Sequence, residues 1–224
     1  MTDTLRTPGS IESGAVALEA VSLTGDRKAP PPGRVTWEEF LAWADDSTRA
    51  EWVDGEIIVT SPSNVEHLRI IGFLFEILRR FVRDRDLGEV FSTELLMRLE
   101  LRASGRVPDL LFITKEHAER VRTTHLDGPA DLVVEVVSPE SDARDHGDKL
   151  VEYEAAGIPE YWLIDPLRQQ AFFYQLGEDK RYRLGLIDGD GYYRSTVLAD
   201  FRLRVTWLWQ QPQPIEEALL ALGL

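Results

Sequence analysis

Two acidic residues stand in parts of the sequence that are otherwise strongly apolar. Glu135 interrupts the apolar run at 132–137, and Asp109 directly precedes the apolar run at 110–113. An ionised carboxylate buried in a strand loses much of its solvation unless a metal ion, a basic side chain or a raised pKa compensates. If the two strands pair, the carboxylates can converge on a hard divalent cation. Such a pair predicts Mg²⁺, with Mn²⁺ as its substitute.

Each acid also has a structural interpretation. Glu135 could be half of a buried ion pair, or it could lie at the solvated end of its strand. Asp109 follows Pro108, and proline suits a strand start or an edge because it gives the ladder no donor. Backbone amides could then hold Asp109 at the strand entry. Both interpretations stay open when each acid is considered alone.

A lysine follows the Glu135 strand on a helix predicted over 145–156. Asp145, Lys149 and Tyr153 are four residues apart and therefore share a face of that helix. A lysine directed at a metal–carboxylate centre could position the attacking water or offset phosphate charge in the transition state. The alternative is a surface pair between Asp145 and Lys149, with Tyr153 packed below it.

The elements that must position these residues are indicated by capping residues, turns and hydrophobic periodicity. Thr36 and Glu39 have capping-box spacing, and Asp54-Gly55 predicts the turn of a hairpin. Ser63 and Glu66 predict a second capping box, at the start of a long amphipathic helix. Further strands are expected at 89–94, 96–101, 107–113, 131–137, 161–164 and within 170–205, with helices at 115–121 and 214–222. This succession indicates an α/β protein with a mixed (α+β) sheet.

Length and composition limit the remaining choices. A chain of 224 residues with 43% hydrophobic residues can bury a substantial core, and we expect a single domain at 34–224 after a disordered tail at 1–33. The absence of cysteine excludes disulfides, thiol catalysis and cysteine-ligated metals. The apolar runs are too short to span a bilayer, so we expect a cytoplasmic protein without a membrane partner.

The order of several motifs resembles one protein family. The motifs are Pro108-Asp109, Glu135-Val-Val-Ser-Pro139, Asp145-x-x-x-Lys149-x-x-x-Tyr153, Gly157-Ile-Pro-Glu-Tyr-Trp-Leu-Ile-Asp-Pro166, Glu51-Trp-Val-Asp-Gly-Glu56 and Ser61-Pro-Ser-Asn-Val-Glu-His67. Together they resemble the Uma family of restriction-endonuclease-like proteins, within the PD-(D/E)XK nuclease superfamily, over about residues 35–175. The resemblance implies a restriction-endonuclease-like core, in which helices flank a central mixed β-sheet, with an extra N-terminal hairpin and C-terminal strands.

The resemblance also implies an activity and its residues. The expected activity is metal-dependent endonucleolytic hydrolysis of DNA phosphodiester bonds, by a protein that pairs as a homodimer. Asp109 and Glu135 match the acidic motif positions and are expected to bind the metal. The superfamily places its lysine two residues after the second acid, where this chain has Val137. Lys149 matches the helix lysine of the Uma-like pattern and completes the expected catalytic set.

Further site candidates and functions remain open. Glu51, Glu66 and His67 compete for an additional acidic or metal-binding role near the first core helix, and Tyr153 shares the face of Lys149. A net charge of −14 gives no bulk attraction to nucleic acid. One alternative is therefore a catalytically inactive nuclease-fold protein acting in protein or nucleic-acid association, and another is a hydrolase of smaller phosphorylated substrates. A dimer could also gather scattered bases around a groove, either Arg98, Arg102 and Arg106 or Arg181 and Arg183.

Overall fold

The computed structural model describes residues 29–45, 49–59, 63–92, 94–100, 103–138 and 144–224. Most of the predicted tail at 1–33 lies outside the described residues. Its last part already contacts the folded chain, because the Trp43 indole donates a 3.0 Å hydrogen bond to the Ala29 carbonyl. The described helices are α1 (Trp37–Trp43), α2 (Val65–Asp84), α3 (Lys149–Ala156) and α4 (Ile215–Ala221). None of them is both long and apolar enough to cross a membrane.

A large mixed sheet forms the centre of the protein. Its strands are β3 (Gly88–Ser92), β6 (Leu110–Thr114), β8 (Leu132–Val136), β9 (Glu160–Asp165), β10 (Gln170–Leu176) and β11 (Tyr182–Leu184), in the spatial order β11-β10-β9-β8-β6-β3. Within this sheet, β8 and β9 are parallel and the other described neighbours are antiparallel. Parallel neighbours need a crossover connection, and α3 supplies it. The predicted mixed sheet is therefore confirmed.

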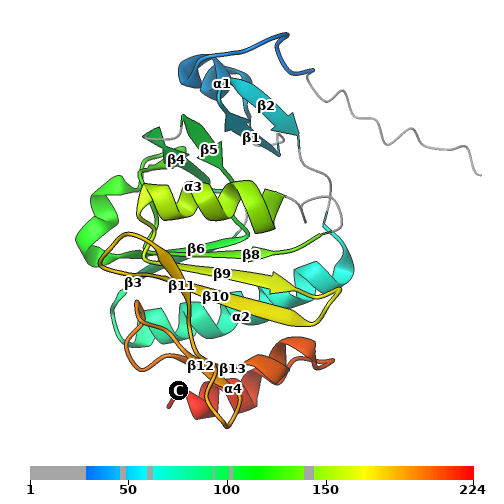
Figure 1. Ribbon diagram of the computed structural model, residues 1–224, viewed down its shortest axis with the longest axis vertical. Helices are drawn as coiled ribbons and strands as arrows, with labels where there is room; N and C mark the ends of the chain where they lie inside the picture. The colour runs from blue at the N-terminus through cyan, green and yellow to red at the C-terminus, as the bar shows by residue number, and fades with distance from the viewer. Residues whose placement is uncertain (1–28, 46–48, 60–62, 93, 101–102, 139–143) are drawn as a thin grey trace, which may run out of the picture.

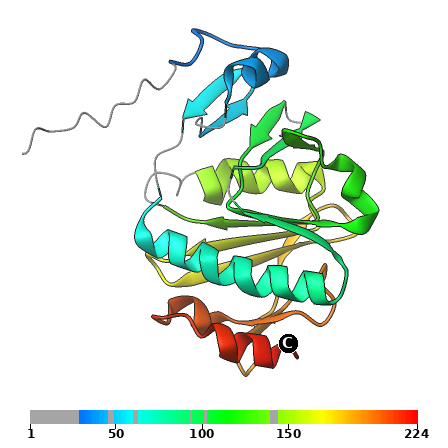
Figure 2. The same ribbon diagram turned by 180° about the vertical axis from the view of Figure 1, so that it is seen from behind.

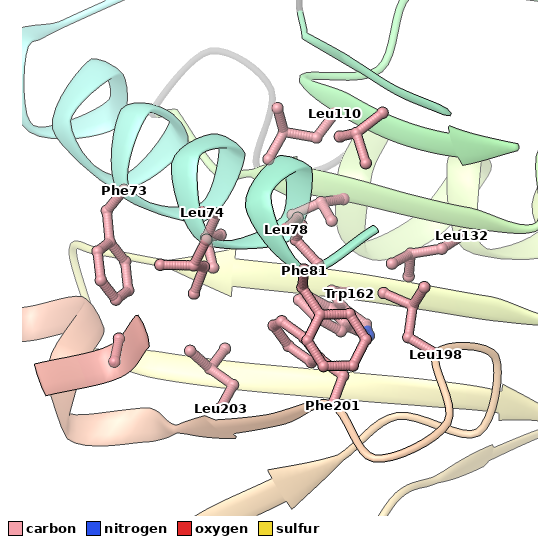
Figure 3. Packing of buried hydrophobic residues seen from close by; sticks show 14 of the residues in the cluster. Phe73, Leu74, Leu78, Phe81, Leu110, Leu132, Trp162, Leu198, Phe201 and Leu203 are labelled. Carbon is pink, nitrogen blue, oxygen red and sulfur yellow. The ribbon is translucent and has the colours of Figure 1, made fainter. Parts of the chain in front are cut away.

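Helix α2 covers one face of this sheet (Figure 2). Its buried side chains include Leu74, Leu78 and Phe81, which pack with Leu110 of β6 and Trp162 of β9 (Figure 3). The same cluster includes residues of α4 and of the short ribbon formed by β12 (Tyr192–Arg194) and β13 (Arg202–Arg204). The predicted amphipathic helix thus buries its apolar stripe against the sheet and anchors the C-terminal segment.

A smaller sheet lies on the other side of α3, so this helix is placed between two sheets (Figure 1). Its strands are β1 (Ala50–Val53), β2 (Glu56–Val59), β4 (Leu96–Leu99), β5 (Ser104–Arg106) and β7 (His125–Asp127), in the order β2-β1-β5-β4-β7. The predicted turn joins β1 to β2, with φ 48° at Asp54 and 86° at Gly55. The capping box of Thr36 and Glu39 is also confirmed, at the start of α1.

The structure corrects three sequence predictions. The N-cap of α2 is Asn64 rather than Ser63, and its side chain accepts a 2.9 Å hydrogen bond from the His67 backbone. The strand predicted at 107–113 begins only at Leu110, as β6; residues 107–109 form a link from β5, which ends at Arg106, and the proline at 108 cannot donate to a ladder. The helix predicted at 145–156 begins with a wider π-helical turn, Arg144–Asp148, before α3. Two further short helices are 3₁₀ turns, Lys115–Arg120 and Val205–Trp209.

Candidate active site

The register of β6 and β8 brings the two predicted acids together. These strands are antiparallel, with Leu110 opposite Val134. One residue further, Asp109 is opposite Glu135, and side chains at directly opposed positions project from the same face. The Val136 backbone amide donates a 2.7 Å hydrogen bond to Asp109 Oδ2, which fixes the aspartate against β8. The strand pairing on which the predicted convergence depends is therefore present, and Asp109 contacts the backbone of β8.

Glu135 is buried, and its two oxygens have different environments. Lys149 Nζ lies 2.9 Å from Oε1, and the Tyr153 hydroxyl donates a 2.8 Å hydrogen bond to the same atom. Within the described ranges, no group donates a hydrogen bond to Oε2. One oxygen of Glu135 is thus held by α3, while the other accepts no hydrogen bond from the described residues.

Lys149 projects from α3 into a group of three carboxylates. Its Nζ lies 2.9 Å from Glu135, 3.1 Å from Asp145 Oδ1 and 3.5 Å from Glu51 Oε1. The Asp145 contact is electrostatic rather than an aligned hydrogen bond, since Oδ1 has no hydrogen-bond partner within the described part of the chain. The amine therefore points inward: the pair of Asp145 and Lys149 considered from the sequence is formed, but it is buried and not at the surface.

Burial and crowding perturb the charged groups of this cluster. Burial is the main cause that raises the pKa of Glu135 to about 8; Lys149 opposes this shift, while neighbouring carboxylates add to it. Burial also opposes the charge on Lys149, but the surrounding carboxylates outweigh it and hold the lysine pKa well above its ordinary value. The positive charges of Lys149 and Arg106 outweigh the cost of burying Glu51, and they lower the pKa of its carboxyl group. Lys149 is therefore a persistent ammonium group.

His67 joins the cluster from the first turn of α2. Its ring faces inward from the first turn of the helix, and Nε2 lies 3.0 Å from Asp109 Oδ1. Of the three competing candidates, Glu51 and His67 reach the cluster, whereas Glu66 is exposed and does not. The structure thus gathers Asp109, Glu135, Lys149, Glu51, His67 and Tyr153, and their catalytic roles stay predictions.

Two further residues of the cluster did not stand out in the sequence. Arg106 was expected among surface bases that could line a nucleic-acid groove; this was wrong, because it is 1% exposed and bound to Glu51 and Glu152. The sequence signal that could have indicated its burial was its position three residues before Asp109, next to an apolar segment. Glu152 gave no signal beyond its place on the helix after Lys149. Arg102, another of those bases, lies outside the described residues.

The donor set suits a hard cation better than zinc. Zinc sites in proteins use three or four nitrogen, sulfur or oxygen ligands, whereas Mg²⁺ is often held by one or two carboxylates with water completing its shell. No cluster of three or more His, Cys, Asp or Glu side chains with metal-binding geometry occurs in the described ranges. Asp109 and Glu135 fit Mg²⁺ as a two-carboxylate site, because Glu135 Oε2 accepts no hydrogen bond from the described residues.

Comparisons with known proteins agree with this fold. A family model described as "Uma2: Putative restriction endonuclease" matches residues 37–206. A crystal structure of a "putative nuclease belonging to DUF820" from Anabaena variabilis ATCC 29413 is similar, with a TM-score of 0.65 and 19% identity over 78% of this chain and 97% of that chain. No curated protein matches the chain significantly. The extent of the family match shows that the chain belongs to the Uma2 family of restriction-endonuclease-like proteins.

Proposed function

We propose that this protein is a Mg²⁺-dependent endonuclease that hydrolyses DNA phosphodiester bonds. The observation that carries the proposal is the surplus of carboxylates in one contact network. Three of them, Glu51, Glu135 and Asp145, share the single ammonium of Lys149. Asp109 lies opposite Glu135 and adds to its raised pKa. A divalent cation between Asp109 and Glu135 supplies the missing positive charge and explains why such acids are retained in apolar strands.

The residues have separable roles in this proposal. Asp109 and Glu135 would hold the ion, and the Val136 amide and Tyr153 hydroxyl fix their orientations. A bound Mg²⁺ polarises phosphate oxygens and lowers the pKa of coordinated water. Because its pKa is raised, Lys149 serves as a fixed positive charge for the phosphate in the transition state rather than as a general base.

One observation favours a second function. The ion pair between Glu135 and Lys149 partly satisfies the glutamate without any metal. This is the arrangement expected of a catalytically inactive nuclease-fold protein that acts in protein or nucleic-acid association. Calorimetric titration with Mn²⁺ separates the two functions. Binding that is lost in Asp109→Asn supports the metal-dependent nuclease, and no binding by the wild type supports the inactive protein.

The direct test is cleavage of supercoiled plasmid and of linear duplex DNA with Mg²⁺ or Mn²⁺. Asp109→Asn keeps the shape of the side chain but removes its charge, and it should reduce cleavage at least about 100-fold, since a ligand that activates the nucleophile is impaired. Glu66→Gln is the matched control, because Glu66 is an exposed acid on α2, next in sequence to His67. Equal cleavage by wild type and Asp109→Asn rejects the site. Sedimentation of the wild type tests the expected homodimer.

A further inference from the structure

Arg106 is a buried arginine whose guanidinium group joins two carboxylates from different elements. It lies at the end of β5 and is 1% exposed. Its Nε and Nη2 donate to the two oxygens of Glu152 on α3, over 2.8 and 2.6 Å. Its Nη1 donates to Glu51 Oε2 on β1, over 2.8 Å. The small sheet and α3 are therefore joined by one planar group with fixed geometry.

The contact with Arg106 determines where Glu51 can direct its second oxygen. With Oε2 held by the guanidinium, Oε1 faces the Val107 amide at 3.3 Å and Lys149 Nζ at 3.5 Å. Val107 belongs to the segment that leads from β5 through Pro108 to Asp109. Glu51 consequently contacts both the lysine and the segment that carries the predicted metal ligand.

We propose that Arg106 is a positioning residue for the candidate active site. Through Glu51 it orients the Lys149 ammonium toward Glu135, and it fixes the segment from Val107 to Asp109. These contacts connect the small sheet with the large one. The N-terminal hairpin therefore contributes to the site through Glu51 on β1. This inference rests on the proposed nuclease function for its effect on rate, but its geometric part can be measured independently of activity.

A role in stability alone does not account for a guanidinium at this position. Burying charged groups costs desolvation energy that their attraction often only repays, and apolar residues of similar volume are commonly as stabilising. The interface between β5 and α3 could therefore be closed by apolar side chains. Arginine instead offers a rigid fork whose donors serve Glu51 and Glu152 at the same time. The fixed geometry of the guanidinium group orients Glu51, and through it the Lys149 ammonium.

The experiment compares Arg106→Lys with Glu152→Gln in the full chain. The sequence contains only four lysines, at 28, 115, 149 and 180. Lysine labelled with ¹³C and ¹⁵N therefore gives a sparse spectrum, in which the signal of buried Lys149 is assigned by its loss in Lys149→Met. Arg106→Lys keeps one positive charge but cannot bind both carboxylates, and the signal of its added lysine is told apart from that of Lys149 in the double variant Arg106→Lys/Lys149→Met. Glu152→Gln leaves the Arg106–Glu51 contact in place and weakens only the contact between Arg106 and residue 152.

We expect Arg106→Lys to shift or broaden the Lys149 signal and to lower kcat about 10- to 100-fold with KM nearly unchanged, as small misplacements of catalytic groups do. Glu152→Gln should change the same readouts in the same direction but less. A folded Arg106→Lys protein with the wild-type Lys149 signal and kcat overturns the inference. If that variant does not fold, an unchanged signal and kcat in Glu152→Gln overturn it. A wild type that cleaves no DNA refutes the proposed function, while the Lys149 signal still decides the positioning role.

Discussion

Replacing Glu135 with glutamine should make the metal-free protein more stable at about pH 8 but not at about pH 5. Burial is the largest cause of the raised pKa of Glu135, about 8 against an ordinary 4.5, and Lys149 offsets it only in part. Glutamine retains an oxygen that can accept from Lys149 and from the Tyr153 hydroxyl, but it carries no charge. The variant therefore removes the cost of a buried carboxylate while keeping the local contacts.

The sign and size of the effect follow from proton linkage. A carboxyl with a raised folded-state pKa stabilises the fold fully below its unfolded pKa and loses that contribution as the pH rises through the folded value. For Glu135 this window extends from about pH 4.5 to about pH 8. Between about pH 5 and pH 8, the wild type should lose roughly 3–4 kcal/mol of unfolding free energy through this residue. In a chain of this size, the loss corresponds to a fall of roughly 10 °C in Tm.

Thermal unfolding with EDTA, followed by circular dichroism across this pH range, measures the effect. The difference between wild type and Glu135→Gln separates Glu135 and the groups coupled to it, Lys149, Asp145, Asp109 and Glu51, from the remaining acids of the protein. Added Mg²⁺ at about 100 times its Kd should then stabilise the wild type at about pH 8 by about 2.7 kcal/mol and leave Glu135→Gln almost unchanged. Glu66→Gln, at an exposed site, should follow the wild type throughout. Parallel Tm–pH curves for wild type and Glu135→Gln would refute the electrostatic reasoning on which the metal site rests.

Three other substitutions test the surroundings of the site and the fold. Lys149→Met leaves several buried carboxylates without their cation and should cost about 3–5 kcal/mol in urea denaturation at neutral pH; an unchanged midpoint would show that the cluster is not coupled to stability. Glu160→Gln should cost about 2–4 kcal/mol, measured by the same method, because this buried carboxylate accepts hydrogen bonds from residues 193–197. Gly88→Ala should lower Tm by several degrees, corresponding to about 1–3 kcal/mol, since a Cβ at φ 156° would collide with the Ile113 carbonyl; an unchanged Tm would contradict the close approach of β3 to β6.

The paired acids could be predicted because their signal is local. An acid in an apolar strand is visible in a few consecutive residues, whereas its position opposite the second acid depends on the antiparallel register of β6 and β8, which no local pattern contains. The hairpin turn at Asp54-Gly55 and the cap at Thr36 are local in the same sense. In each case the physical cause lies within one element or one turn, so the sequence pattern contains it.

Arg106 and Asp145 show where the sequence was insufficient. An arginine at the end of a short strand is more often solvated than buried, and nothing near Arg106 in the chain indicates that Glu51 and Glu152 will surround it. Asp145 was correctly placed on the face of Lys149, but helical spacing alone allowed a surface pair. What buries both residues is the packing of α3 between two sheets (Figure 1), a property of the tertiary structure that no single periodicity contains.

The valine at the usual lysine position is explained by the same packing. Val137 follows Glu135 by two residues on the same side of the sheet, and it is fully buried in the apolar cluster that contains Tyr153 and Tyr161. A charged side chain there would have to enter that cluster. Helix α3 covers this side and places the Lys149 ammonium 2.9 Å from Glu135 Oε1. Electrostatic stabilisation depends on the distance from a charge to the reacting groups and not on the strand or helix that carries it. The departure at Val137 therefore moves the positive charge to another element without removing it from the site.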